Sequence, residues 1–143
     1  MAKAPIVSLA DVLVDLLNAA TFSQEFTATR RYYPHTKLEE ADGLVVSVVP
    51  AAVERVPGTR AGPAIIASID AAVQKSVIDE NDKATIDPLM LLVDEIVTEY
   101  HNETPAAGAI VTASTNDPIY IPEHLRDLHL FTSVIRFTFR DAR

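Results

Sequence analysis

The stretch Ala64-Ile-Ile-Ala-Ser-Ile-Asp-Ala-Ala-Val-Gln-Lys-Ser-Val77 decides the fold. Apolar and polar side chains alternate along it, which is the period-two pattern of a β-strand with one buried face. The apolar side carries Ile65, Ala67, Ile69, Ala71, Val73 and Val77. The polar side carries Ser68, Asp70, Gln74 and Ser76. A strand of about thirteen residues is roughly 40 Å long when extended, so this sequence predicts an unusually long strand for a small domain.

Four further strands are predicted from β-branched and aromatic runs bounded by turn residues. They cover Glu25–Tyr33, Leu44–Val49, Ala109–Ser114 and Leu128–Arg140. The strand 44–49 is apolar on both faces, so we expect it inside the sheet. Pro50 bends or ends this strand, which leaves a continuation over 51–56 open.

Two amphipathic helices are predicted from apolar residues at three- and four-residue spacing. The first runs from Ser8 to Ala20, with Ser8 as its cap and Pro5 outside it. The second runs from Pro88 to His101, with Asp87 as its cap and Pro88 in the first position. The buried stripe expected for the second helix is Leu89, Leu92, Val93, Ile96, Val97 and Tyr100.

This order of elements predicts an α+β fold in a single domain spanning residues 1–143. We expect a mostly antiparallel mixed sheet of about five strands, with both main helices packed on one face. The other face, carrying Ser68, Asp70, Gln74 and Arg136, is then wet or meets a partner. The loop from Val56 to Pro63, which contains Pro57-Gly58 and Gly62-Pro63, is expected to order only in an assembly.

Charge and composition exclude several classes of protein. The 143 residues carry 12 basic and 20 acidic side chains, a net charge of −8, which argues against binding the phosphate backbone as the main activity. The absence of cysteine excludes disulfides, thiolate zinc sites and a cysteine nucleophile. No apolar run is long enough for a membrane span, and the first residues lack a signal-peptide core, so we expect a cytoplasmic protein.

No motif predicts catalysis, a metal or a cofactor. The four histidines match no ligand spacing, and phosphate-binding loops and nucleophile elbows are absent. Asp79, Asn81 and Asp82 resemble the start of a calcium loop, but the required Gly is missing and the closing position is Met90. The acidic residues of the second helix, Asp94, Glu95 and Glu99, are interpreted as a solvated face, with an acid–base pair as the alternative.

One basic and aromatic cluster stands out, Arg30-Arg-Tyr-Tyr33. Alternation puts Arg30 and Tyr32 on one face of a strand and Arg31 and Tyr33 on the other. Such residues stack bases in nucleic-acid readers and anchor protein interfaces. The acidic net charge favours the interface, in which Arg30, Arg31, Tyr32 and Tyr33 meet Asp94, Glu95 and Glu99 of a neighbour. An edge strand with no partner is the remaining alternative.

The layout of these segments resembles a known family. The quoted strand leads into Ile86-Asp-Pro-Leu-Met-Leu-Leu-Val-Asp-Glu-Ile96, after Arg31-Tyr-Tyr-Pro34 and Gly43-Leu-Val-Val-Ser-Val-Val-Pro50. The chain closes with Leu130-Phe-Thr-Ser-Val-Ile-Arg-Phe-Thr-Phe139. This order is similar to that of the tail terminator (tail completion) and neck proteins of long-tailed bacteriophages, most strongly over Ile65–Ile96.

The resemblance implies a structural virion protein without enzyme activity, assembled in the host cytoplasm. It implies a closed ring, usually a homo-hexamer, that ends polymerisation of the tail tube and joins tail to head. The implied partners are further copies of the chain, the tail tube protein and a head-completion or connector protein. DNA would pass through without specific binding, and no membrane, cofactor or metal is implied. Two alternatives stay open: a head-closure or adaptor protein, and an α+β ligand-binding domain or enzyme.

Overall fold

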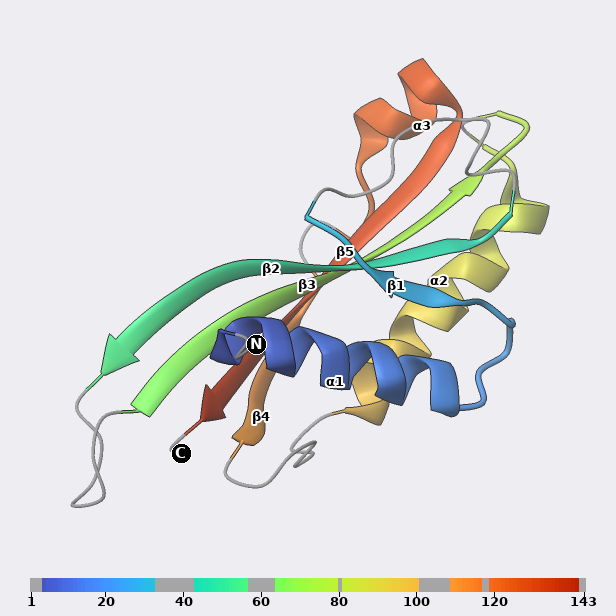
Figure 1. Ribbon diagram of the computed structural model, residues 1–143. Helices are drawn as coiled ribbons and strands as arrows, with labels where there is room; N and C mark the ends of the chain where they lie inside the picture. Colours follow the sequence, from blue (N-terminus) through green and yellow to red (C-terminus); the bar gives the residue numbers. More distant parts are fainter. Residues whose placement is uncertain are drawn as a thin grey trace.

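The computed structural model describes residues 4–32, 43–56, 64–79, 81–100, 109–116 and 119–141. In chain order the elements are α1 (Pro5–Ala19), β1 (Ala28–Arg30), β2 (Val45–Val56), β3 (Ala64–Ser76), α2 (Lys83–Glu99), β4 (Ala109–Thr115), α3 (Pro122–Leu128) and β5 (Leu130–Asp141). Within these residues the strands form one sheet in the order β1-β2-β3-β5-β4 (Figure 1). The β1–β2 pair is parallel and the other pairs are antiparallel, which confirms the predicted α+β class and the mixed, mostly antiparallel sheet.

Strand β3 is the middle of the sheet, and β2 also lies inside it, as expected for residues 44–49. It pairs with β2 along one edge and with β5 along the other, over nearly its whole length. Every second residue from Ile65 to Val73 is buried, and these side chains line the core face. The apolar face of the quoted stretch is therefore the floor of the hydrophobic core.

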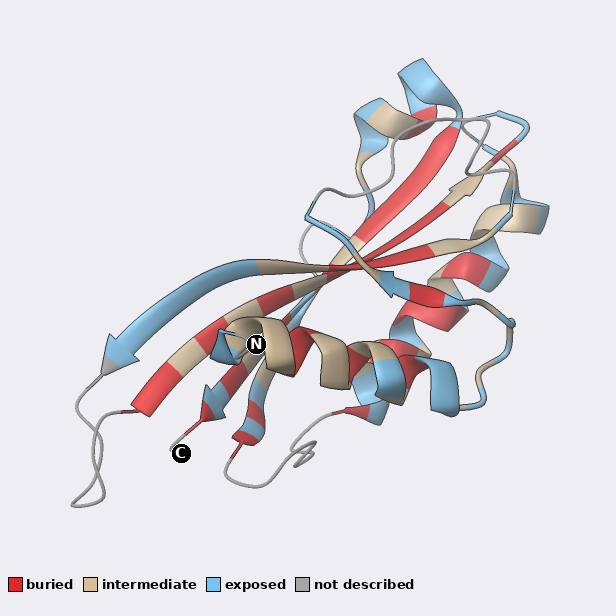
Figure 2. Ribbon diagram, in the orientation of Figure 1, coloured by how far each residue is buried: buried red, intermediate tan, exposed pale blue. Residues whose placement is uncertain are grey.

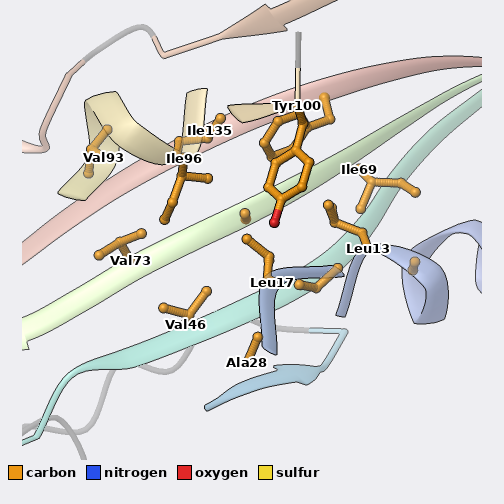
Figure 3. Close-up of a cluster of buried hydrophobic side chains, with 14 of the residues drawn as sticks. Leu13, Leu17, Ala28, Val46, Ile69, Val73, Val93, Ile96, Tyr100 and Ile135 are labelled. Carbon is orange, nitrogen blue, oxygen red and sulfur yellow. The ribbon is translucent and has the colours of Figure 1, made fainter. Parts of the chain in front are cut away.

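Both long helices cover that same face. In the close-up of the core, Leu13 of α1 lies beside Ile69 and Ile96 of α2 lies beside Ile135 (Figure 3). The burial colours show the same arrangement, with red segments along the middle strands and on both helices (Figure 2). The hydroxyl of Tyr100 donates a 3.0 Å hydrogen bond to the carbonyl oxygen of Leu16, which joins the ends of the two helices.

Both helices begin earlier than their sequence signals predicted. In α1 the first residue is Pro5, and the cap, Ala4, makes no side-chain hydrogen bond, so the predicted cap Ser8 is wrong. In α2 the cap is Asp82, whose carboxylate accepts the N–H of Thr85, and Pro88 lies inside the helix. Proline lacks an N–H, but a capped turn ahead of Pro88 lets the helix start before it.

The Asp82 cap makes stability depend on pH. Hydrogen bonds from the N–H of Ile78 and from Thr85 lower the pKa of the Asp82 carboxyl, because they stabilise its charged form. A depressed folded pKa adds stability that is present above the unfolded pKa of about 4 and is lost as the pH falls through the folded pKa.

We therefore expect Asp82→Asn, whose single amide oxygen can accept only one of these two hydrogen bonds, to be less stable than the parent protein near neutral pH. Below about pH 4 the variant should lose less stability than the parent, because only the aspartate is protonated there. Urea unfolding at pH 7 and pH 3 measures both differences. Parallel pH profiles for the two proteins would contradict this role of the carboxylate.

Two predicted strands differ in extent. Among its described residues, the strand expected over 25–33 is paired only over Ala28–Arg30, because the rings of Phe22 and Phe26 stack at 5.7 Å and hold the preceding residues in a loop. Strand β2 continues through Pro50 with a register shift between Pro50 and Ala52. A third helix, α3, lies between β4 and β5, and His129 joins it to β5 with a left-handed φ of 49°.

The outer face of the sheet is partly covered rather than wholly wet. Ser68 and Asp70 are half-buried and Arg136 is exposed, but Gln74 and Ser47 are fully buried. Gln74 donates to the hydroxyl of Thr132 at 3.3 Å, and Thr132 also contacts Nδ1 of His124 on α3. The expectation of a solvated Gln74 is therefore wrong. Residues 57–63 of the loop expected to order on assembly lie outside the described residues.

Candidate functional site

The basic cluster on β1 is built around Arg30. Its Nε lies 2.7 Å from Oδ1 of Asp11 on α1, and one terminal nitrogen donates to the hydroxyl of Tyr32 at 2.9 Å. The guanidinium carbon lies 5.5 Å from the centre of the Tyr32 ring. The hydrogen bonds to Tyr32 and to Asp11 raise the pKa of Arg30. Arg30 is therefore held by its own subunit, which the sequence pattern alone did not indicate.

The other members of the cluster are more open. Arg31 donates to the hydroxyl of Thr29 at 3.1 Å, on the side of the chain opposite to Arg30 and Tyr32. The side chain of Tyr32 is 70% exposed. The predicted alternation of Arg30 with Arg31 agrees with these contacts, and Tyr33 lies outside the described residues. Arg31 and Tyr32 are the members that a partner can reach.

The acidic residues of α2 are not brought to this cluster within one subunit. Asp94 and Glu99 are exposed, while Glu95 accepts hydrogen bonds from the backbone N–H and the hydroxyl of Ser23, in the loop after α1. Glu95 thus ties α2 to the α1–β1 loop. Any contact between the basic cluster and the acidic face of α2 would have to form between subunits.

The edges of the sheet form a second candidate surface that was not singled out from the sequence. Strand β1 pairs only with Val46–Val48, so no strand of the described chain pairs with the outer edge of β2 from Val49 to Val56. The side chains from Ala51 to Arg55 are all exposed, and this end of β2 and β3 extends away from α1 (Figures 1 and 2). On the opposite side of the sheet, β4 is the outermost strand of the described residues.

The outer face carries an exposed ion pair. Arg136 on β5 and Asp70 on β3 face each other in the register and form two hydrogen bonds of 2.8 and 3.1 Å. These contacts with Asp70 raise the pKa of Arg136. The pair lines a shallow cavity of about 430 Å³ together with Thr115 and Val134. The prediction that Asp70 and Arg136 share the outer face agrees with this geometry.

Two other surfaces have the shape of contact sites. At the α3 end, a cavity of about 280 Å³ between α2 and α3 is lined by the exposed ring of Tyr120 and by Ile86, Met90 and Leu125, among others. Between α1 and β1 an open cavity of about 560 Å³ is lined by Phe22 and Phe26 among others. Sequence reasoning missed both, because they depend on how α3 and the loop after α1 fold back.

The described residues hold neither a cluster suited to a metal ion nor a helix suited to a membrane. They contain no group of three or more His, Cys, Asp or Glu placed to hold a metal ion. No helix in the described part of the chain has the length and apolar character to cross a membrane.

No protein-family model matches the chain, and no curated protein matches it.

Proposed function

We propose that the protein is a structural virion subunit that forms a ring at the head-proximal end of a phage tail. The ring ends polymerisation of the tail tube and joins the tail to the head. The observation that carries this proposal is the long end of β2, which is exposed and unpaired among the described strands while it belongs to an otherwise well-packed sheet. Unpaired strand edges invite pairing with another chain.

A ring of identical subunits needs two different, complementary surfaces on each subunit. The sheet supplies two edges, β1–β2 and β4, and the charged groups supply a basic and an acidic region on separate elements. The net charge of −8 suits a channel for DNA, because a negative wall repels the phosphate backbone and prevents it from sticking. The apolar surface at α3 and the outer face of the sheet are then left to bind the tail tube protein and the head connector.

A second candidate function is a small ligand-binding domain. The specific observation in its favour is the open cavity of about 560 Å³ beside Phe22 and Phe26, which falls in the size range of small-molecule sites. Another head–tail connector role, head closure or adaptor, uses the same surfaces with a different neighbour. The oligomeric state separates the ligand-binding class from both connector roles.

The test is light scattering on the purified protein after size exclusion, followed by electron microscopy. The proposal expects rings, formed by the subunit alone or on addition of the tail tube protein, and tubes that stop growing once the rings are added. A subunit that stays monomeric alone and in mixtures with the tube and connector proteins would overturn the proposal. Rings that bind a connector but leave tube growth unchanged would replace the terminator role with the adaptor role.

Substitutions in the basic cluster test whether it lies in the interface between subunits. The double change Arg30→Glu with Arg31→Glu should weaken assembly, but Arg30→Glu also places a carboxylate beside Asp11 in the same subunit. We therefore expect Arg31→Glu alone to be the cleaner change, with a folded monomer and slower, weaker assembly, because charge complementarity sets encounter rate and register.

Lys83→Glu is the matched control for Arg31→Glu. It changes the net charge by the same amount on an exposed residue at the start of α2, where a negative charge suits the helix dipole. Sedimentation at two salt concentrations compares the variants. Equal assembly by Arg31→Glu and Lys83→Glu would remove the basic cluster from the interface.

A further inference from the structure

The two free edges of the sheet lie at the same level along the strands. Glu54 at the end of β2 is paired with Ile66, Ile66 with Arg140, and Arg140 with Ile110 at the start of β4. The unpaired part of β2 therefore lies directly across the sheet from β4. The free segment of β2 covers residues 49–56 and β4 covers residues 109–115, so the two edges are of closely similar length.

The strand directions make these edges compatible with one another. From β2 to β4 each neighbouring pair is antiparallel, so β2 and β4 run in opposite directions. If a second copy continues the sheet with its helices on the same side, its β4 lies antiparallel to the free edge of β2. Antiparallel pairing is the more stable arrangement per residue, and it needs no rearrangement of either sheet.

We propose that the subunits of the ring join by strand addition, with β4 of one copy pairing along residues 51–56 at the free edge of β2 in the next. The inference rests on the proposed ring and names its interface. Each contact joins two different surfaces, so the same contact repeats from one subunit to the next. The subunits form a closed ring when the rotation between neighbours divides a full turn. The contact also covers the unpaired end of β2 and the outer edge of β4, and such edges otherwise expose a protein to uncontrolled aggregation.

The side chains on the two edges fit this pairing. On the core face, Val53, which is 44% exposed, comes beside Val111 of the neighbour, a pair of β-branched residues of the kind that stabilises adjacent strands. On the outer face, Glu54 comes beside Ile110 of the neighbour, which is 47% exposed. Two of the exposed large apolar side chains of the described residues are thereby covered.

Charge favours the same register. The outer row reads Glu54, Ile66, Arg140 and Ile110, and then reaches the next copy's Glu54. The neighbouring core-side row reads Arg55, Ile65, Asp141 and Ala109, and then the next Arg55. Charges thus keep alternating in sign across the junction in both rows, and a slip by one residue would break this order.

Disulfide trapping tests the pairing directly, because the chain has no cysteine of its own. Glu54→Cys and Ile110→Cys are made as separate proteins, mixed, assembled and oxidised. We expect covalent dimers in the mixture and none in either protein alone, since directly opposed residues on paired strands come within disulfide range. Thr115→Cys, at the far end of β4, is the matched control that should not cross-link to Glu54→Cys.

A second measurement does not depend on the geometry of a disulfide. Val53→Lys and Ile110→Lys should each raise the protein concentration needed for half-assembly by about tenfold or more, because a lysine on an edge opposes strand addition. Leu91→Lys is the control, since Leu91 is 54% exposed on α2 away from both edges. All three monomers should keep their circular dichroism spectrum.

The outcomes separate this inference from the ring itself. Rings without a cross-link between the two cysteine proteins, and with no effect of the edge lysines, overturn strand addition and leave the ring intact. Cross-linking of Glu54→Cys to itself overturns the head-to-tail arrangement in favour of a two-fold dimer. The absence of any assembly overturns the proposed function first.

Discussion

Leu92→Ala is expected to lower the free energy of unfolding by about 2–5 kcal/mol. Leu92 is fully buried on the face of α2 that packs on the sheet, within the same cluster as Leu89 and Ile96. Truncation removes apolar area from the core and leaves a cavity that the rigid sheet below cannot fill. Urea unfolding followed by circular dichroism measures the loss.

Leu91→Ala is the control in the same turn of α2. Leu91 is 54% exposed, so its truncation should change stability by no more than about 0.5 kcal/mol. Comparing the two variants tests which face of α2 packs on the sheet. Similar losses for Leu91→Ala and Leu92→Ala would mean that a different face of α2 packs on the sheet.

The periodic segments were predictable because burial on one face leaves a regular trace in the sequence. The alternation from Ile65 to Val73 identified β3 and its core face, and the spacing of Leu89, Leu92, Val93 and Ile96 identified the buried side of α2. Both signals arise from many residues at once, so a single exception does not hide them. The sequence therefore predicts the position of a long, regular element more reliably than the residues at which it begins and ends.

Element ends and pairings were less predictable, because they depend on single contacts made in three dimensions. The start of α2 depends on the carboxylate of Asp82 and not on the more obvious Asp87–Pro88 pair. The short β1 depends on the Asn18 side chain, which hydrogen-bonds to both backbone groups of Ala28 at 2.7 and 3.1 Å. Nothing local in the sequence indicates that β1 runs parallel to β2.

The candidate surfaces were likewise only partly predictable from the sequence. The alternation of Arg30 and Arg31 was readable, but the ion pair between Arg30 and Asp11 joins residues 19 apart on different elements. The free edge of β2 was not readable either, because it follows from β1 being short. Sequence reasoning identified which residues share a face, and the fold decides which of those faces are still available to a partner.

Phe137→Ala is expected to lower the free energy of unfolding by about 3–5 kcal/mol, the second large effect on this core. Phe137 is fully buried on β5, and its ring meets Tyr100 edge-on with centroids 6.0 Å apart. Tyr100 in turn hydrogen-bonds to Leu16, so Phe137 supports the junction where the ends of α1 and α2 meet over the sheet.

Tyr100→Phe separates the two parts of this junction. It keeps the ring against Phe137 and removes only the hydroxyl that donates to Leu16, so its expected cost is about 0.5–1.5 kcal/mol. Thermal and urea unfolding of both variants, with hydrogen exchange of α1, measure the difference. Phe137→Ala should increase exchange in α1 and α2 together, because both helices rest on the same aromatic pair. A loss for Phe137→Ala no larger than that for Tyr100→Phe would show that the ring contact does not hold the helices to the sheet.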